Sequence, residues 1–315
     1  MRINQVCVLG GSGFVGSAIV HKLSAAGYAV KVLSRRREGA KHLTLLPNVQ
    51  VAECDVFNNA ELSMHMQSCD AVINLVGILH EGKNVTFDAM HHNLPKRIAV
   101  LCERLGIKRL LHMSALQTSA EAPSAYLRSK AAGETAVMAH SKKINVTIFQ
   151  PSVIFGRGDN FLNMLATVVK LMPVIALAKP DARFQPIWVE DVAEAFVSSL
   201  DNVATYGKTY ELGGPRVYTL RELVEFVIFV LGKKRKIVGL NDKLSYWQAY
   251  AMEKLPIKLM TRDNFYSMQV DSICNGPLAA ELGIKPTAIE AVVPEYLAND
   301  TPRAAYDRFR GMAGR

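Results

Sequence analysis

The sequence contains few cysteines, and none of them is arranged as in a disulfide framework or a metal site. The five cysteines are scattered over 315 residues, at positions 7, 54, 69, 102 and 274, and no two form a Cys-x-x-Cys pair. This odd number and wide spacing disfavour both a disulfide scaffold and a zinc site. The eight histidines show no ligand spacing either. We therefore predict no metal site, and we expect buried thiols in a reducing cytosol.

Long uncharged apolar runs are also missing. A membrane-spanning helix needs about 20 apolar residues, whereas the candidate run at 161–180 is interrupted by Lys170 and Pro173. Met1 leads directly into a strand-like run at 5–10, which leaves no room for a signal peptide, so we expect a cytoplasmic location. With 50% hydrophobic residues, the chain is long enough to bury a sizeable core and is not expected to be disordered.

Positive charge is in excess, with a net charge of +9 and a pI near 9.3. Such a balance suits an anionic partner, such as phosphate, nucleic acid or acidic lipid, and does not choose among them. We predict no nucleic-acid partner, because the basic run at 233–236 has no recognisable nucleic-acid-binding module around it.

Short apolar runs alternate with helical patterns through the first half of the chain. Strand-like runs occur at 5–10, 29–34, 49–55, 71–77, 109–115 and 145–156, and helical patterns at 17–27 and 97–106 lie between some of them. This alternation predicts an α/β fold with a parallel sheet that is covered on both faces. Beyond residue 156 the alternation stops, although Thr219 with Glu222 marks the capped start of a helix at 219–232.

A glycine-rich segment joins the first predicted strand to the first predicted helix. Its glycines fit two overlapping registers, Gly-x-x-Gly-x-x-Gly and Gly-x-Gly-x-x-Gly. Either register permits a tight turn, close approach of a pyrophosphate and close helix packing, while the helix N-terminus supplies N–H donors. We therefore predict a dinucleotide-binding, Rossmann-type doubly wound sheet. Its cofactor-binding loop consists of Gly10, Gly11, Ser12, Gly13, Phe14, Val15 and Gly16.

We divide the chain accordingly. Residues 1–155 and 206–232 are assigned to the NAD(P)-binding domain, and residues 156–205 and 233–298 to a smaller, interleaved C-terminal lobe for a substrate or partner. Residues 299–315 are assigned to a flexible basic tail.

The end of the second predicted strand distinguishes between the two nicotinamide cofactors. An acidic residue there would accept hydrogen bonds from a free ribose 2′-hydroxyl, but this chain has Ser34, Arg35 and Arg36. A hydroxyl and two guanidiniums suit a 2′-phosphate, so NADP(H) is predicted in preference to NAD(H), which stays the alternative. Asp55, which ends the third strand, has two interpretations: an acceptor for the adenine amino group, or a cap of the next helix.

Tyr126 precedes Lys130 by four residues in an alanine-rich stretch, so both side chains lie on one face of a helix. A nearby ammonium lowers the pKa of a tyrosine from about 10 and so allows proton exchange with a substrate near neutral pH. The alternative is a pair of ordinary solvent-facing residues. A second Tyr-x-x-x-Lys match, Tyr250 with Lys254, shows that so short a motif also arises by chance.

Together these motifs resemble the extended short-chain dehydrogenases/reductases, of the NAD-dependent epimerase/dehydratase type. The resemblance covers about residues 5–232 and includes the "NLVG" run at 74–77 and the segments 150–159, 186–196 and 210–223. More narrowly, 124–134 and 151–163 are similar to an atypical group, the NADPH-binding accessory subunits of respiratory complex I and their bacterial relatives. The resemblance implies that Tyr126 and Lys130 are the acid–base pair, whereas Tyr250 lies past the sheet and matches by chance. It also implies that Val76, Gly77, Pro151 and Ser152 lie beside the cofactor.

One departure from the family affects catalysis. Relatives carry a hydroxyl residue directly after the serine that matches Ser114, and this chain has Ala115 there. Unless Ser114, Thr118 or Ser119 supplies the hydroxyl, turnover is expected to fall by about two or three decades. We take Ser114 as the catalytic candidate. In addition, Gln150 replaces a frequent arginine, and Asn93 is either an active-site support, as in relatives, or a turn residue.

The segment 231–260 mixes basic with aromatic and aliphatic residues. One interpretation is peripheral contact of 233–260 with an acidic membrane, or with a complex in it, at the inner membrane face. The other, which we favour from sequence, is that the lysines complement a helix C-terminus while Trp247 and Tyr250 pack inside.

Two functional classes follow from these features. The first is an NADP(H)-dependent oxidoreductase or epimerase that acts on an unidentified alcohol or ketone. The second is a catalytically weak or inactive NADPH-binding accessory or assembly protein of a membrane respiratory complex.

Overall fold

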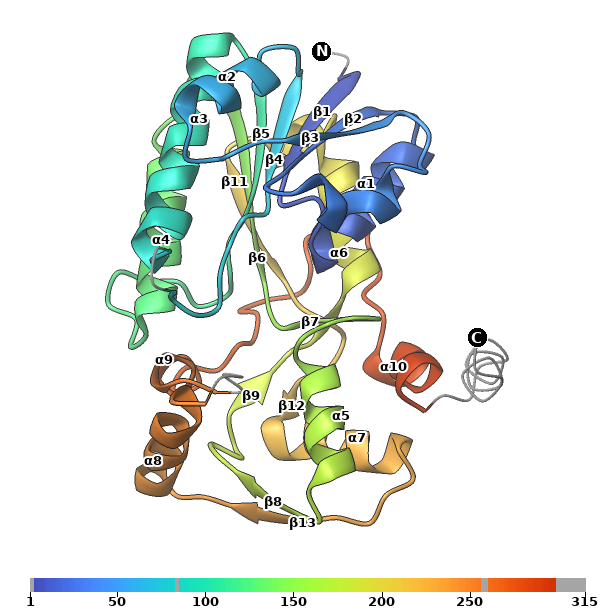
Figure 1. The fold of residues 1–315 in the computed structure, drawn as a ribbon, viewed down its shortest axis with the longest axis vertical. Helices are drawn as coiled ribbons and strands as arrows, with labels where there is room; N and C mark the ends of the chain where they lie inside the picture. The colour runs from blue at the N-terminus through green and yellow to red at the C-terminus, as the bar shows by residue number, and fades with distance from the viewer. Residues whose placement is uncertain (1–2, 83–84, 256–259, 299–315) are drawn as a thin grey trace. The chain divides into compact units, whose positions relative to one another are not determined.

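The computed structural model describes residues 3–82, 85–255 and 260–298, and these residues form two compact units (Figure 1). Unit 1 contains the described residues within 1–151, 189–212 and 274–285, and unit 2 contains those within 152–188, 213–273 and 286–315. The tail predicted at 299–315 lies outside the described residues.

Unit 1 is built on one seven-stranded sheet in the order β11-β6-β5-β4-β1-β2-β3, and all neighbouring strands pair in parallel. The central strands are buried on both faces, and for this reason they read in sequence as continuous apolar runs. The α/β, Rossmann-type fold class is thereby confirmed. The strands are β1 (Gln5–Leu9), β2 (Ala29–Ser34), β3 (Val49–Glu53), β4 (Ala71–Asn74), β5 (Arg109–Met113), β6 (Asn145–Pro151) and β11 (Lys208–Leu212).

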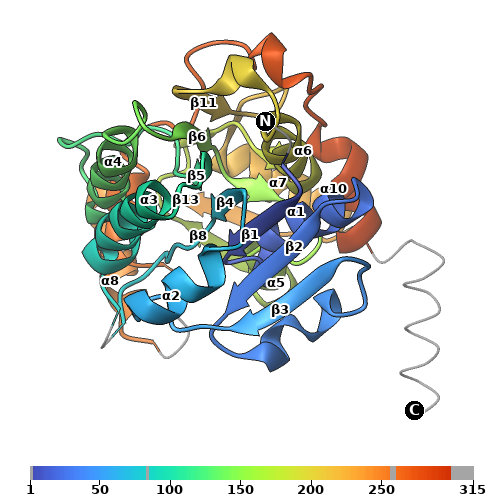
Figure 2. The ribbon, with the colours of Figure 1, turned by 90° about the horizontal axis from the view of Figure 1, so that it is seen from above.

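Helices cover both faces of this sheet (Figure 2). One face carries α1 (Phe14–Ala25) and α6 (Val189–Ser199), which pack on each other, and the other carries α2 (Asn59–Met66), α3 (Leu94–Leu105) and α4 (Ala125–Met138). A π-helical turn, η2 (Asp88–Asn93), leads into α3. Three 3₁₀ turns complete the unit: η1 (Arg37–Leu43), η3 (Val203–Thr205) and η4 (Ala280–Leu282).

Unit 2 is built from helices and three two-stranded ladders around its own apolar core. The strands are β7 (Ile154–Phe155), paired with β10 (Ile187–Trp188), β8 (Val174–Leu177), paired with β13 (Lys236–Gly239), and β9 (Arg183–Phe184), paired with β12 (Tyr218–Thr219). The helices are α5 (Leu162–Leu171), α7 (Leu220–Val230), α8 (Asp242–Glu253), α9 (Arg262–Ser267) and α10 (Ile289–Leu297). The predicted cap of α7 is confirmed as a full capping box between Thr219 and Glu222.

The division differs from the predicted one at two helices and at residues 274–285, which we assigned to the smaller lobe and which belong to unit 1. We assigned 156–205 to the smaller lobe, but α6 belongs to unit 1, where the ring of Phe196 lies 4.3 Å from that of Phe149 on β6. We assigned 206–232 to the nucleotide-binding domain, but α7 buries Leu223 and Val227 in the core of unit 2. Both helices are amphipathic, and periodicity shows that a helix has an apolar face without showing which core receives it.

Candidate functional site

The turn between β1 and α1 brings its glycines into close contact. Gly10 has a φ of +79°, in the left-handed region that glycine adopts readily. A Cβ on Gly16 would lie 2.2 Å from the carbonyl oxygen of Gly10, so no other residue allows α1 to begin so close to β1. Gly13 is the N-cap of α1, and neither a side-chain cap nor an acidic first-turn residue accompanies it. The turn is thus a cradle that leaves helix N–H donors for an anion.

At the end of β2, Arg35 and Arg36 have exposed side chains. Ser34 Oγ donates a hydrogen bond to the Arg36 carbonyl at 2.9 Å, so its proton is already used within the turn. The guanidiniums, and not the Ser34 hydroxyl, are therefore the donors that this turn offers to an anion.

One of the two interpretations of Asp55 was that it caps the next helix, and the structure shows that it does not. The N-cap of α2 is Asn58, whose Oδ1 accepts from the N–H groups of Ala60 and Glu61. Asp55 Oδ1 instead accepts from the N–H of Phe57 at 2.9 Å, and the side chain is exposed just beyond β3. This bond holds the carboxylate at the carboxyl end of the sheet.

Lys130 lies on α4 with only 4% of its surface exposed. Its Nζ donates to the carbonyl of Met113 at 3.2 Å, and it would lie 3.2 Å from a Cβ placed on Gly77. Burial lowers the pKa of Lys130 to about 8, and Glu134 partly opposes this effect. An ammonium thus lies against the backbone that follows β4, where Val76 N–H is held by Asn74 Oδ1. A lysine with a lowered pKa in such a position can tune a neighbouring acid or base.

His91 on η2 joins the backbone of Ile78 to that of Tyr126 through Ser129, and the sequence analysis did not identify it. Ile78 N–H donates to His91 Nε2 at 3.0 Å, so the neutral ring carries its proton on Nδ1, which lies 2.9 Å from Ser129 Oγ. Ser129 Oγ in turn donates to the Tyr126 carbonyl at 2.7 Å. Burial, and then the charge of Lys130, lower the pKa of His91 to about 2. His91 therefore stays neutral and acts as a fixed connector.

The Tyr126 ring is held by aromatic contacts. Its centroid lies 5.3 Å from that of His91 and 5.9 Å from that of Phe87, both in edge-on geometry. Tyr126 and Lys130 thus lie on one face of α4 as predicted, and Tyr126 is half-buried. The sequence offered no signal that favours His91 over the neighbouring His92, because η2 has π geometry and a 3.6-residue period does not describe it.

Of the three hydroxyls proposed to compensate for Ala115, only that of Ser114 is unengaged. Within the described part of the chain, Ser114 Oγ has no hydrogen-bond partner, although only 3% of the surface of the residue is exposed. Thr118 Oγ1 donates to Glu134 at 2.7 Å, and Ser119 Oγ accepts from a nearby backbone N–H. Gln150 Nε2 also donates to both carboxylate oxygens of Glu134, at 2.9 Å each. Glu134 thus fixes both Thr118 and Gln150, and of these two only Gln150 is a departure from the family pattern.

Pro151 and Ser152 fall in different units. Pro151 ends β6, and its carbonyl accepts from Leu116 N–H at 3.1 Å. Ser152 begins unit 2, where its Oγ donates to the Ser272 carbonyl at 2.7 Å and accepts from Gln185 N–H at 3.2 Å. Because the hydroxyl of Ser152 is engaged there, its predicted contact with a cofactor would have to use the backbone.

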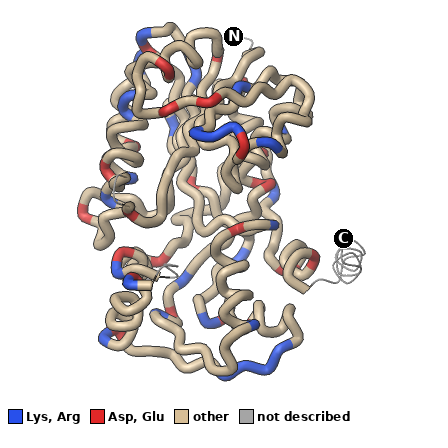
Figure 3. The backbone as a smooth tube through the Cα atoms, viewed as in Figure 1, with Lys and Arg blue, Asp and Glu red and all other residues tan. Residues whose placement is uncertain are grey.

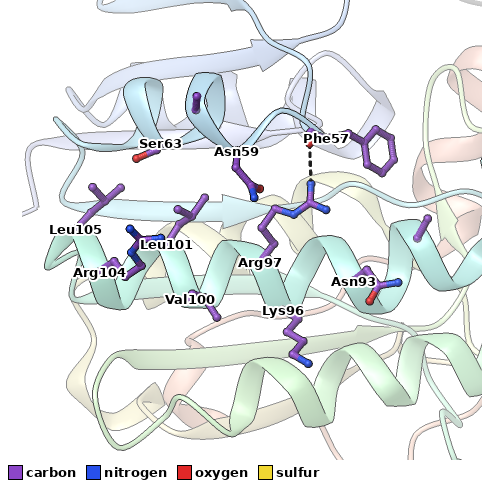
Figure 4. A pocket seen from close by; sticks show the side chains of 12 residues that line it. Phe57, Asn59, Ser63, Asn93, Lys96, Arg97, Val100, Leu101, Arg104 and Leu105 are labelled. Atoms are coloured by element: carbon purple, nitrogen blue, oxygen red, sulfur yellow. Dashed lines mark hydrogen bonds between the residues drawn. The ribbon is translucent and has the colours of Figure 1, made fainter.

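Asn93 is exposed, and its Nδ2 donates to Asp88 Oδ2 at 2.5 Å, so it is neither aimed at Tyr126 nor the N-cap side chain of α3. It lines a surface groove of about 740 Å³ between α2 and α3, together with Lys96, Arg97 and Arg104 (Figure 4). Arg97 Nη1 donates across this groove to the carbonyl of Phe57 at 3.1 Å. Apart from Asn93, the groove is lined by none of the residues predicted for cofactor or catalysis.

Residues 6–213 match the model of the NAD dependent epimerase/dehydratase family. Among curated proteins, the chain is 32% identical to "NADH dehydrogenase [ubiquinone] 1 alpha subcomplex subunit 9, mitochondrial" of Arabidopsis thaliana, over 88% of this chain and 71% of that protein. It is 29% identical to the protein of the same name from Mus musculus, over 92% of this chain and 78% of that one.

Among solved structures, the fold is similar to that of a UDP-glucuronic acid 4-epimerase from Bacillus cereus in complex with UDP-glucuronic acid and NAD. The TM-score is 0.69 at 17% identity, over 93% of this chain and 98% of the epimerase. At this level of identity the likeness concerns the fold alone. The family match and the relatives together confirm the resemblance inferred from the sequence.

Proposed function

The chain belongs to the NAD dependent epimerase/dehydratase family, and from this membership we propose that it is an NADP(H)-binding oxidoreductase or epimerase acting on an alcohol or ketone. The observation that carries the proposal is the buried Lys130, whose pKa is lowered to about 8 beside Gly77 and four residues after Tyr126. A solvent-facing helix pair would have no such lysine.

The residues of the first turn fit a dinucleotide. The space that a Cβ on Gly16 would fill is occupied by the Gly10 carbonyl, and the uncapped start of α1 suits a pyrophosphate. Arg35 and Arg36 would bind the 2′-phosphate that distinguishes NADP(H), and Asp55 would accept from the adenine amino group. When bound, the cofactor supplies the hydride acceptor or donor.

The protein residues would handle the proton. The Lys130 ammonium would stabilise the phenolate of Tyr126, so that the phenol can give its proton to a substrate oxygen in one direction and the phenolate can take that proton back in the other. The unengaged hydroxyl of Ser114 would donate a hydrogen bond to the same oxygen and so replace the hydroxyl lost at Ala115. His91 would hold Tyr126 in place through Ser129 and the edge-on ring contact.

A second candidate function is that of an NADPH-binding accessory or assembly protein with weak or no turnover. Ala115 favours it, and so do the relatives at 32% and 29% identity that are named as NADH dehydrogenase subunits. In this case the nucleotide would serve as a stabilising ligand, and residues 233–260 would contact a membrane or a complex within it.

Two measurements test these candidates. NADPH should raise the melting temperature in proportion to the logarithm of its concentration, and NADH should do so less; a shift with NADH alone would reject the arginine argument. Carbonyl compounds should then be screened with NADPH for the wild type, for Tyr126→Phe, and for Tyr250→Phe as the control with the same motif. Turnover that Tyr126→Phe abolishes and Tyr250→Phe preserves supports the enzyme. Equal rates in all three remove Tyr126 from the mechanism, and binding without turnover favours the accessory role.

A further inference from the structure

Exposed apolar side chains occur in the β8–β13 ladder of unit 2 and near the ends of the two helices that precede its strands. Leu171, at the end of α5, is 73% exposed, and Phe229, near the end of α7, is 81% exposed. In the ladder, Val174 lies opposite Lys236, and Val174 and Val238 are 47% and 41% exposed, while the alternate residues face the core. One face of this small sheet therefore presents two valines and Lys236 to solvent.

Lysines surround these apolar side chains. Lys170 precedes Leu171, and the run that contains Lys233, Lys234 and Lys236 connects α7 to β13; all four are exposed. Figure 3 shows this run as a continuous basic stretch at one end of unit 2. Arg235 is held in place, because its Nε donates to the Val169 carbonyl at 2.7 Å and so fastens the run to the end of α5.

Helix α8 carries a further apolar stripe on its outer side. It packs on the unit through Ser245 and Ala249, both fully buried, whereas Leu244 and Trp247 are 53% and 63% exposed. Ala251 continues the stripe at the spacing i, i+3 and i+7. We predicted that Trp247 and Tyr250 pack inside. Both side chains are exposed, so this prediction is wrong. Besides these two small residues, Tyr246 packs against α9, where its ring centroid lies 5.9 Å from that of Phe265, whereas Leu244 and Trp247 stay outside.

Helix α8 also contacts strand β8 of the ladder. Gln248 Nε2 donates to the carbonyl of Ala176 on β8 at 2.8 Å, and Figure 1 shows α8 beginning at the end of unit 2 where β8 and β13 lie. The acidic residues of α8 are paired, Asp242 with Lys179 and Glu253 with Arg262. The exposed lysines nearby therefore give this region an excess of positive potential.

We propose that this surface, which we call the lipid-facing surface, docks on an anionic phospholipid bilayer. It consists of Lys170, Leu171, Val174, Phe229, Lys233, Lys234, Lys236, Val238, Leu244 and Trp247. The proposal deepens the second candidate function and rests on it for its biological setting, but it requires neither turnover nor nucleotide.

Charge and side-chain type together identify the partner. Lysines alone would suit any polyanion, but exposed Trp and Phe beside aliphatic side chains suit the boundary between headgroups and acyl chains. Each lysine is attracted to the negative potential of acidic headgroups, while the apolar side chains enter the interface. No helix within the described residues is long and apolar enough to cross a membrane.

The test is flotation of the full chain with vesicles of phosphatidylcholine containing phosphatidylglycerol, and with vesicles of phosphatidylcholine alone. The protein should float with the acidic vesicles. High salt should release it, because the ions screen the attraction between the lysines and the acidic headgroups. Reversing three lysines, as in Lys233→Glu with Lys234→Glu and Lys236→Glu, should weaken binding on the order of a hundredfold or more. Trp247→Glu should also weaken it by at least about tenfold, since it places a charge at the interface.

Controls separate this surface from exposed apolar residues in general. Leu45→Glu changes a leucine that is 89% exposed in unit 1, and it should leave flotation unaffected. The chain has two tryptophans, so Trp188→Phe leaves Trp247 as the single tryptophan. Its fluorescence should shift to the blue on acidic vesicles. Absence of flotation and of a blue shift would overturn the proposal, and so would equal binding to both kinds of vesicle. Thermal shifts with NADPH on the same variants report on unit 1, so failure to bind lipid is distinguishable from failure to bind nucleotide.

Discussion

Replacing Lys130 by methionine should stabilise the protein at neutral pH while it removes the proposed acid–base pair. The buried ammonium has a pKa of about 8, against an ordinary value of 10.5. At about 1.36 kcal/mol per pKa unit, holding the charged form in the folded state costs about 3 kcal/mol at pH 7. The variant also loses the hydrogen bond to the Met113 carbonyl, which contributes about 1 kcal/mol. A net stabilisation of about 2 kcal/mol therefore remains.

A salt-bridged lysine usually stabilises the folded protein at neutral pH, whereas the charged form of Lys130 destabilises it. Because the pKa of Lys130 is lowered on folding, the unfolded chain binds the proton more tightly than the folded one. The cost is present in full below pH 8 and disappears as the pH rises from 8 to 10.5. Across that window the wild type should gain about 3 kcal/mol relative to Lys130→Met, so the advantage of the variant disappears and the wild type becomes the more stable by about 1 kcal/mol.

Urea unfolding at pH 7 and at pH 10 measures this difference. Lys142→Met is the matched control, because Lys142 is exposed just after α4 and its replacement should change stability little. Thermal shifts with NADPH on the same proteins should show that Lys130→Met binds the cofactor more weakly. A Lys130→Met protein that is less stable than the wild type at pH 7, or a difference that does not change with pH, would refute the reasoning.

Three further variants test the site. Gly133→Ala would place a Cβ 1.9 Å from the His91 carbonyl oxygen; although alanine favours a helix by about 1 kcal/mol, urea unfolding should show a net loss of about 1–3 kcal/mol, and a gain would contradict the packing described. Ser114→Ala should leave stability unchanged or raised by up to about 1 kcal/mol while turnover falls by about two decades or more; undiminished turnover would exclude Ser114 from catalysis. Arg35→Asp with Arg36→Asp should weaken NADPH binding by about a hundredfold in calorimetry and leave NADH binding nearly unchanged, whereas equal losses for both would show that the arginines do not read the 2′-phosphate.

Features that depend on neighbouring residues could be predicted from the sequence. The crowding at Gly16 and the left-handed backbone of Gly10 are local properties of one turn, and the glycines that permit them are visible in the chain. The same holds for the capping box of α7, which needs only a threonine and a glutamate three residues apart. The parallel sheet was also predictable, because strands buried on both faces must be apolar throughout.

The surroundings of the candidate acid–base pair depend on contacts between distant segments. His91 reaches Ile78 and Ser129 only because η2 and α4 pack together, and a π turn obscures which face it presents. In the same way, Glu134 engages Thr118 and Gln150 across a fold that brings three separate segments together. Neither arrangement follows from spacing along the chain, since no local rule relates residues that meet only in tertiary structure.

The sequence by itself determined the alternation of strands and helices along the chain, the glycine-rich turn and the spacing of Tyr126 and Lys130. Only the tertiary structure decided that Lys130 is buried, that Ser114 keeps an unengaged hydroxyl, and that α8 directs Trp247 outward. The physical reason is common to all three. Burial, and the pKa values and exposed surfaces that depend on it, are set by what packs against a side chain, and periodicity shows only that a helix has two faces.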